Sequence, residues 1–149
     1  MSNTGHMDQW QLRGEVYGFF SSAGRGPTRA EIEGWVGDPE LAAELLADLH
    51  RDHALVLDDA GEVRMALPFS AVETDHRVVS GDRSWWANCA WDALAVPITL
   101  GIDAQIDARW TDTGEPVGLS IVDGQLSETG GYVHFAVPAR RWWDDIVET

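Results

Sequence analysis

The chain has a single cysteine, Cys89, among its 149 residues, and it has no lysine at all. One cysteine excludes an intrachain disulfide and a zinc site built from several thiolates. No apolar run approaches the roughly 18 residues that a membrane-spanning helix requires. The polar first residues do not resemble a secretory signal peptide. These absences predict a cytoplasmic protein without a membrane partner.

Positive charge is also scarce, because only ten arginines stand against 25 acidic residues and the formal net charge is −15. A chain this acidic is repelled by nucleic acid and by anionic lipid unless it carries a local basic patch. We therefore expect no nucleic-acid partner, and a small molecule is the expected ligand.

The first half of the chain has the pattern of three helices followed by a β-hairpin, which is the order of a winged-helix domain. Thr28 and Glu31 have the spacing of a capping box at the start of the second helix. Asp58-Asp59-Ala60-Gly61 fits a turn between two short alternating runs. We expect a winged-helix-like module over residues 8–75.

This module has the wrong charge for DNA recognition. Residues 1–75 carry 14 acidic residues and five arginines, and four of the acidic residues fall on the third helix. A helix that faces phosphates should be basic, so a structural role is expected. Residues 1–7, which include Gly5-His6-Met7, resemble a cloning remnant and are left out of the fold.

The second half, residues 76–149, is expected to be a mainly antiparallel sheet crossed by one helix, which makes the fold class α+β. Ser84 opens a predicted helix that runs to residue 95 and is ended by Pro97. The predicted strands are residues 104–110, 117–122 and 132–137, and a closing helix is predicted over residues 140–147.

Cys89 and Asp92 are the residues that could carry chemistry. On a helix, positions i and i+3 share a face, so the thiol and the carboxyl could reach one ligand. A thiolate binds a soft electrophile and a neighbouring carboxyl can handle protons. The alternative is a buried, inert cysteine, and the spacing alone leaves both interpretations open.

The sequence around this pair resembles the core signature of the alkylmercury (organomercurial) lyases. The signature has an aromatic residue, then Cys, Ala and Asp at fixed spacing, and then Leu, Pro and Gly. The matching residues are Trp86-Ala87-Asn88-Cys89-Ala90-Trp91-Asp92-Ala93-Leu94 with Pro97 and Gly101. The resemblance extends to Ile106-Asp107-Ala108, to Thr113-Gly114-Glu115-Pro116-Val117 and, upstream, to the helical module.

The resemblance implies a lyase that cleaves a carbon–mercury bond by protonolysis without a cofactor. Two cysteines of the family hold mercury, and an aspartate delivers the proton to the departing carbon. Cys89 matches the first cysteine, which makes it the expected metal ligand, and Asp92 matches the aspartate. Soft thiolate ligands suit a soft metal.

The sequence departs from the family at the second metal-binding cysteine. That cysteine lies beyond a strand that resembles residues 132–137, and the sequence given ends at Thr149 without it. Either the region is absent, or the sequence given is part of a longer chain. A cellular thiol could supply the second sulfur ligand. A further cysteine of the family, thought to be structural, aligns with Trp110.

Four more residues are candidates for the substrate pocket. Trp85, Trp86 and Trp91 either wall an apolar pocket above Cys89 or belong to the core. His134 lies on a predicted strand, where an imidazole is more often structural than catalytic.

Two other functions stay open at this stage. The fold could have been recruited to another reaction on a small apolar metabolite, with Cys89 as nucleophile and Asp92 as acid and base. Alternatively, the protein is a sensor that captures a metal or an electrophile without catalysis.

Overall fold

The computed structural model of the chain describes residues 6–127 and 130–147. Residues 1–5, most of the expected cloning remnant, lie outside the described residues. Three helices come first and a short hairpin follows them, in the predicted order. The helices are α1 (Gln9–Ala23), α2 (Arg29–Val36) and α3 (Pro39–Arg51), and the hairpin strands are β1 (Val56–Leu57) and β2 (Val63–Ala66).

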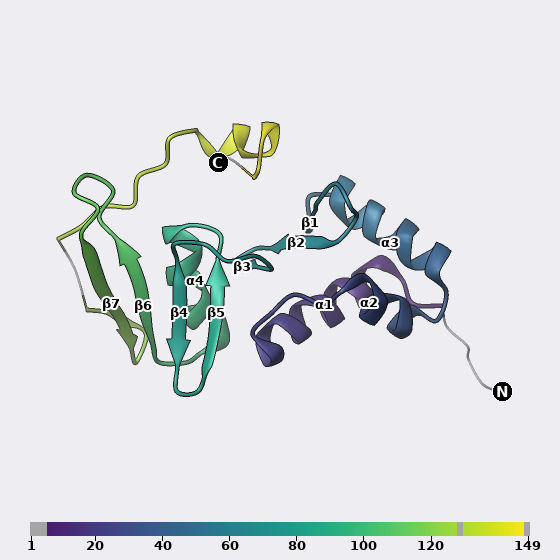
Figure 1. The fold of residues 1–149 in the computed structure, drawn as a ribbon, viewed down its shortest axis with the longest axis horizontal. Coiled ribbons are helices and arrows are strands. Elements are labelled where there is room, and N and C mark those ends of the chain that lie inside the picture. Colours follow the sequence, from purple (N-terminus) through teal and green to yellow (C-terminus); the bar gives the residue numbers. More distant parts are fainter. Residues whose placement is uncertain (1–5, 128–129, 148–149) are drawn as a thin grey trace.

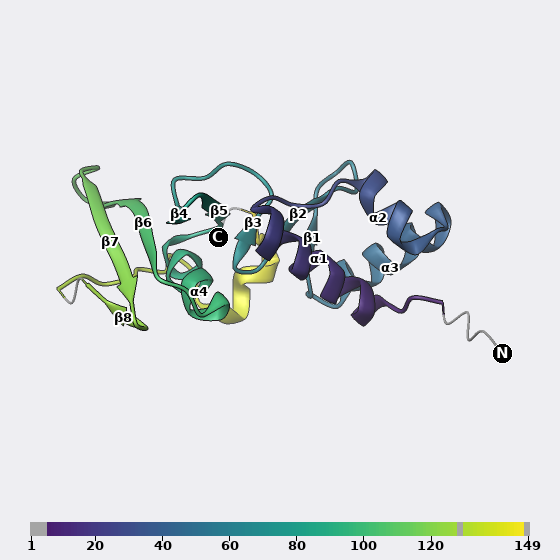
Figure 2. The same cartoon turned by 90° about the horizontal axis from the view of Figure 1, so that it is seen from below.

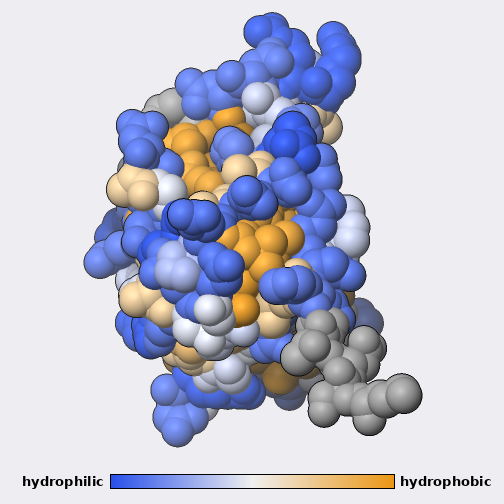
Figure 3. Space-filling model, turned by 90° about the vertical axis from the view of Figure 1, so that its right-hand side faces the viewer, coloured by the Kyte–Doolittle hydropathy of each residue, from blue (hydrophilic) through white to orange (hydrophobic). Residues whose placement is uncertain are grey.

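Local sequence explains where these helices begin. Asp8 and Asp38 accept hydrogen bonds from first-turn N–H groups of α1 and α3, and Thr28 and Glu31 form the predicted capping box of α2. The apolar line of α3 is buried, whereas its acidic residues Glu40 and Glu44 are exposed. Seen from the end of the molecule where α1 to α3 lie, the surface is mostly hydrophilic, with apolar side chains visible in places between the polar ones (Figure 3).

All strands belong to one antiparallel sheet with the order β1-β2-β3-β5-β4-β6-β7-β8. The two-residue strand β3 pairs with β2 on one side and with β5 on the other. It therefore joins the N-terminal hairpin to the rest of the sheet (Figure 1). The remaining strands are β3 (Phe69–Ser70), β4 (Arg77–Ser80), β5 (Arg83–Ala87), β6 (Ala104–Arg109), β7 (Pro116–Val122) and β8 (Gln125–Leu126). The helices and this sheet confirm the predicted α+β class.

The hydrophobic core is continuous from the helices into the sheet. The ring of Phe20, near the end of α1, stacks on the ring of Phe69 in β3 with centroids 5.5 Å apart. Trp85 in β5 is 1% exposed, and its indole N–H donates to the carbonyl of Phe20 at 3.0 Å. The division of the chain at residues 75 and 76 stays a prediction, and both the sheet and the core cross it.

The helix predicted over residues 84–95 is wrong at both ends, because the helix in the structure begins later and ends later than predicted. Residues up to Ala87 form β5, in register with β4, and α4 runs from Ala90 to Leu100. Alternate side chains of β5 are buried. Because neighbouring side chains of a strand point to opposite faces, the strand buries Trp85 while Trp86 stays partly exposed, and one face of a helix would separate the two less well. Pro97 is buried inside α4, and the helix ends at Gly101, whose φ of 63° favours glycine.

Two predictions for the last part of the chain are also wrong. Residues 132–137 are not a strand, and the last strand of the described sheet is the two-residue β8, which pairs with β7. Residues 140–147 do not form an α-helix, and a short 3-10 helix, η1 (Ala139–Asp144), takes their place. The segment runs back from the sheet and places η1 near α4 (Figures 1 and 2). It thereby returns the end of the described chain to the middle of the molecule.

Candidate functional site

Cys89 lies at the junction between β5 and α4. It is the N-cap residue of α4, with extended backbone angles (φ −150°, ψ 179°), and its side chain makes no capping hydrogen bond. Asp92 follows in the first turn of the helix. The structure thus moves Cys89 from the second turn of a helix, where the sequence placed it, to the helix terminus. There the positive end of the helix dipole is closest.

Asn88 is a part of this site that the sequence interpretation missed. Its amide N–H groups donate to the Asp92 carboxylate at 3.1 Å and to the carbonyls of Pro68 and Phe69 at 3.3 and 3.2 Å. The Asn88 carbonyl oxygen is buried and has no hydrogen-bond partner among the described residues. Asn88 therefore ties Asp92 to the backbone that enters β3. The only signal in the sequence was an amide side chain between apolar neighbours.

The thiol and the carboxyl share a partly buried environment that disfavours charge. Burial raises the pKa of the Asp92 carboxyl, and hydrogen bonds from Asn88 and Cys89 offset part of that rise. Burial also raises the pKa of the Cys89 thiol. The first-turn N–H groups of Asp92 and Trp91 lower it again, while the charge of Asp92 raises it. This environment therefore favours the neutral forms of both the thiol and the carboxyl.

Both groups line a small apolar cavity of about 80 Å³. Three parts of the chain form it: the turn between β2 and β3, the start of α4, and the C-terminal segment. The lining residues are Met65, Leu67, Asn88, Cys89, Trp91, Asp92, Phe135, Trp142, Ile146 and Val147. A thiol and a carboxyl in an otherwise apolar cavity could bind a soft electrophile and transfer a proton to it.

Only one of the four predicted pocket residues lines this cavity. Trp91 does, and it stays 54% exposed overall. Trp85 is instead in the core, because its position on β5 points it toward Phe20. Trp86 pairs across the sheet with Arg77, whose guanidinium lies 5.7 Å from its ring. His134 lines a separate cavity of about 220 Å³ between α4, β6 and the C-terminal segment. Trp85, Trp86 and His134 therefore do not line the cavity at Cys89.

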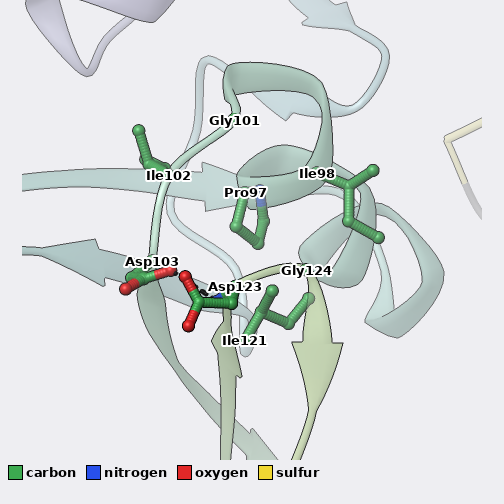
Figure 4. Close-up of a pocket in the computed structure, with 8 residues that line it drawn as sticks. All are labelled: Pro97, Ile98, Gly101, Ile102, Asp103, Ile121, Asp123 and Gly124. Carbon is green, nitrogen blue, oxygen red and sulfur yellow. Dashed lines mark hydrogen bonds between the residues drawn. The ribbon is translucent and has the colours of Figure 1, made fainter.

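A third cavity, of about 310 Å³, lies at the other end of α4, beside Pro97 and Ile121 (Figure 4). Its two carboxylates, from Asp103 and Asp123, lie close together, and the Asp123 backbone N–H donates to Asp103 at 2.9 Å. Among residues 6–127 and 130–147, no three His, Cys, Asp or Glu side chains come together as metal ligands. Cys89 is the one thiol in the sequence, and the thioether of Met65, a weaker soft ligand, lines the same cavity.

The fold agrees with comparisons to known proteins. A family model described as alkylmercury lyase matches residues 69–149. Because this match covers more than half of the sequence, the chain belongs to the alkylmercury lyase family. The match begins at β3 and includes the whole of α4 and the C-terminal segment.

A solved structure supports the same fold. The mercury-bound form of MerB2 superposes with a TM-score of 0.63 and 22% sequence identity, over 80% of this chain and 60% of that one. The chain thus spans 60% of the length of that protein. A comparison with curated proteins found no match. No helix in the described part of the chain combines the length and the apolar character that crossing a membrane requires.

Proposed function

We propose that the protein cleaves the carbon–mercury bond of a small organomercurial by protonolysis. The observation that carries this proposal is the pairing of the Cys89 thiol with the Asp92 carboxyl inside an apolar cavity, at the first turn of α4. The two residues also stand at the matching positions of the family signature. Family membership supports the reaction class, the family resemblance implies the residue roles, and the closeness of the two groups supports them.

In the first step, the Cys89 sulfur bonds to the mercury atom of the substrate. The thiol proton passes to the Asp92 carboxylate, and the former ligand of mercury leaves with its electron pair. Burial raises the free energy of the thiolate form of Cys89. Bonding to a soft cation stabilises the sulfur without a free negative charge. The Asp92 carboxylate is the hydrogen-bonded proton acceptor for that step.

In the second step, Asp92 returns the proton to the carbon atom bound to mercury. The electron pair of the carbon–mercury bond becomes the new carbon–hydrogen bond, and a hydrocarbon leaves. Mercury stays divalent on the Cys89 sulfur, and no redox change occurs. The raised pKa of Asp92 makes its acid form accessible closer to neutral pH, which suits a general acid.

Release of mercury needs a second sulfur ligand, and the sequence given contains no other cysteine. We propose that a small thiol from the surroundings supplies it. That thiol loses its proton to water as it bonds to mercury opposite Cys89, and a second equivalent displaces Cys89 and passes its own proton to the Cys89 sulfur. The thiol thus acts as co-substrate, and the protein regenerates its starting state.

Product formation tests the proposal directly. The protein is incubated with methylmercury and excess small thiol, and methane in the headspace is measured by gas chromatography. Wild-type protein should release methane, and Cys89→Ser should release at least 100-fold less, because a hydroxyl is a poor ligand for a soft metal. Ser127→Ala, a serine change outside the cavity, serves as control. If wild type gives no methane above the buffer with thiol, the proposed reaction is wrong.

Asn88 should determine the pH at which the reaction rate rises on the acidic side of the pH profile. Its N–H favours the charged carboxylate of Asp92, so Asn88→Ala should raise the pKa of Asp92 further. Because the first step needs the carboxylate form, the rising acidic limb of the rate profile should move to higher pH. Loss of the bonds to Pro68 and Phe69 should also cost about 1–3 kcal/mol of stability.

A matched variant separates the two effects of Asn88. Thr74 donates to the carbonyl of Ala87 at 2.6 Å without touching Asp92. Thr74→Val should therefore lower the melting temperature and leave the acidic limb in place. An unchanged limb in Asn88→Ala would contradict the positioning role of Asn88.

A further inference from the structure

The C-terminal segment, residues 130–147, forms the outer wall of the cavity around Cys89 and Asp92. Four of the ten lining residues come from it: Phe135, Trp142, Ile146 and Val147. All four have apolar or aromatic side chains. The reacting groups come from the opposite wall, at the start of α4. A substrate bound to Cys89 would therefore lie between the reacting pair and this segment.

Aromatic contacts hold the segment in place. The ring of Phe135 lies 6.1 Å from that of Trp91 and 5.1 Å from that of Trp142. The Trp142 indole N–H donates to the carbonyl of Val137 at 2.8 Å, within the segment. The next residue, Trp143, stacks on His53 with centroids 4.1 Å apart and planes 4° apart. Phe135 thus contacts both Trp91 and Trp142, and all three rings line the cavity.

The volume that these rings leave is small. The cavity of about 80 Å³ is roughly half the size of the 150 Å³ cavity that is known to accept benzene in another protein. A methyl or ethyl group on mercury fits the available space. A phenyl group on mercury needs more room and would press against Trp142 and Phe135.

We propose that Trp142, supported by Phe135, sets the size of the organic group and makes the site selective for short alkyl over aryl groups. The inference rests on the proposed carbon–mercury cleavage, whose substrate class it narrows. Trp142 touches the bound organic group and takes no part in proton transfer. The selectivity is a property of the cavity wall, so it also governs any other reagent that reaches the Cys89 sulfur.

Two measurements test this proposal with the same variants. In the first, kcat/KM is measured for methane release from methylmercury and for benzene release from phenylmercury, with excess thiol. Trp142→Ala should raise the phenyl-to-methyl ratio at least 10-fold, in line with the effect of removing steric exclusion in a pocket. Trp142→Phe should give an intermediate ratio. Trp10→Ala, at an exposed tryptophan of α1 outside the cavity, should leave the ratio unchanged.

The second measurement does not depend on carbon–mercury cleavage. Cys89 is labelled with methyl or with benzyl methanethiosulfonate, which forms a Cys89–S–S–R disulfide and releases methanesulfinate. Mass spectrometry gives the two rates, and their ratio cancels differences in thiolate fraction. Trp142→Ala should raise the benzyl-to-methyl ratio at least 10-fold. An unchanged labelling ratio overturns the size limit, whereas a changed ratio without any methane or benzene release overturns only the proposed reaction.

Discussion

Asp92→Asn should lose at least 100-fold in the rate of hydrocarbon release, and it should still capture mercury on Cys89, but more slowly, because the thiol must then lose its proton to water. General acid–base catalysis by a positioned side chain contributes about 10²–10⁴-fold, and an amide cannot deliver the proton that Asp92 delivers. Asparagine keeps the shape of the side chain and can still accept the hydrogen bond that Asn88 now donates at 3.1 Å. The expected product is therefore a stalled adduct of Cys89 with the intact organomercurial.

Single-turnover measurements distinguish capture from cleavage. Headspace gas chromatography follows methane, and mass spectrometry of the intact protein detects the adduct that keeps its organic group. Asp107→Asn, an exposed position on β6, is the matched control and should cleave at the wild-type rate. If Asp92→Asn released methane as fast as wild type, the proton would have to come from another group, and the assigned role of Asp92 would be wrong.

The same variant should change how stability depends on pH. Because the pKa of Asp92 is raised in the folded protein, its contribution to stability is present below the unfolded pKa and is lost as pH rises through the folded pKa. Asp92→Asn has no titrating carboxyl at this position, so it does not lose this stability as the pH rises. Its melting temperature relative to wild type should therefore increase between acidic and neutral pH. A constant difference over that range would show that Asp92 is not in a charge-disfavouring site.

The parts of the fold that the sequence predicted are those that local interactions determine. Asp8, Thr28 and Asp38 cap helices through bonds to residues two or three positions away. The buried line of α3 follows from helical periodicity alone. Cys89, Asp92 and Trp91 could be placed together for the same reason, since they lie within four residues of each other.

The parts that the sequence did not predict depend on distant partners. Residues 83–87 become a strand because β3 and β4 pair with them, and neither pairing is visible in the local pattern. Residues 132–137 alternate like a strand, but they pair with no strand of the described sheet. Asn88 reaches carbonyls 19 and 20 positions away. The outer wall of the cavity comes from residues more than 40 positions beyond Cys89, which no spacing argument connects to it.

The second large effect is expected on the free energy of unfolding, and it comes from the two neighbouring tryptophans of β5. Trp85 is 1% exposed and anchors β5 to α1 through its bond to Phe20, so Trp85→Ala should cost about 3–5 kcal/mol in the free energy of unfolding. That loss is a large fraction of the roughly 5–15 kcal/mol that stabilises a typical domain.

Urea denaturation followed by far-UV circular dichroism measures this loss, and Trp86→Ala is the matched control one residue away. Trp86 is only half-buried and lies beside Arg77, so its replacement should cost about 1 kcal/mol. Trp85→Phe should recover most of the lost stability, because it refills the core and forfeits chiefly one hydrogen bond. The alternation of a strand places these adjacent side chains on opposite faces of the sheet, whereas a helix places them about 100° apart. Equal losses for Trp85→Ala and Trp86→Ala would therefore contradict β5 itself, and with it the position of Cys89 at the start of α4.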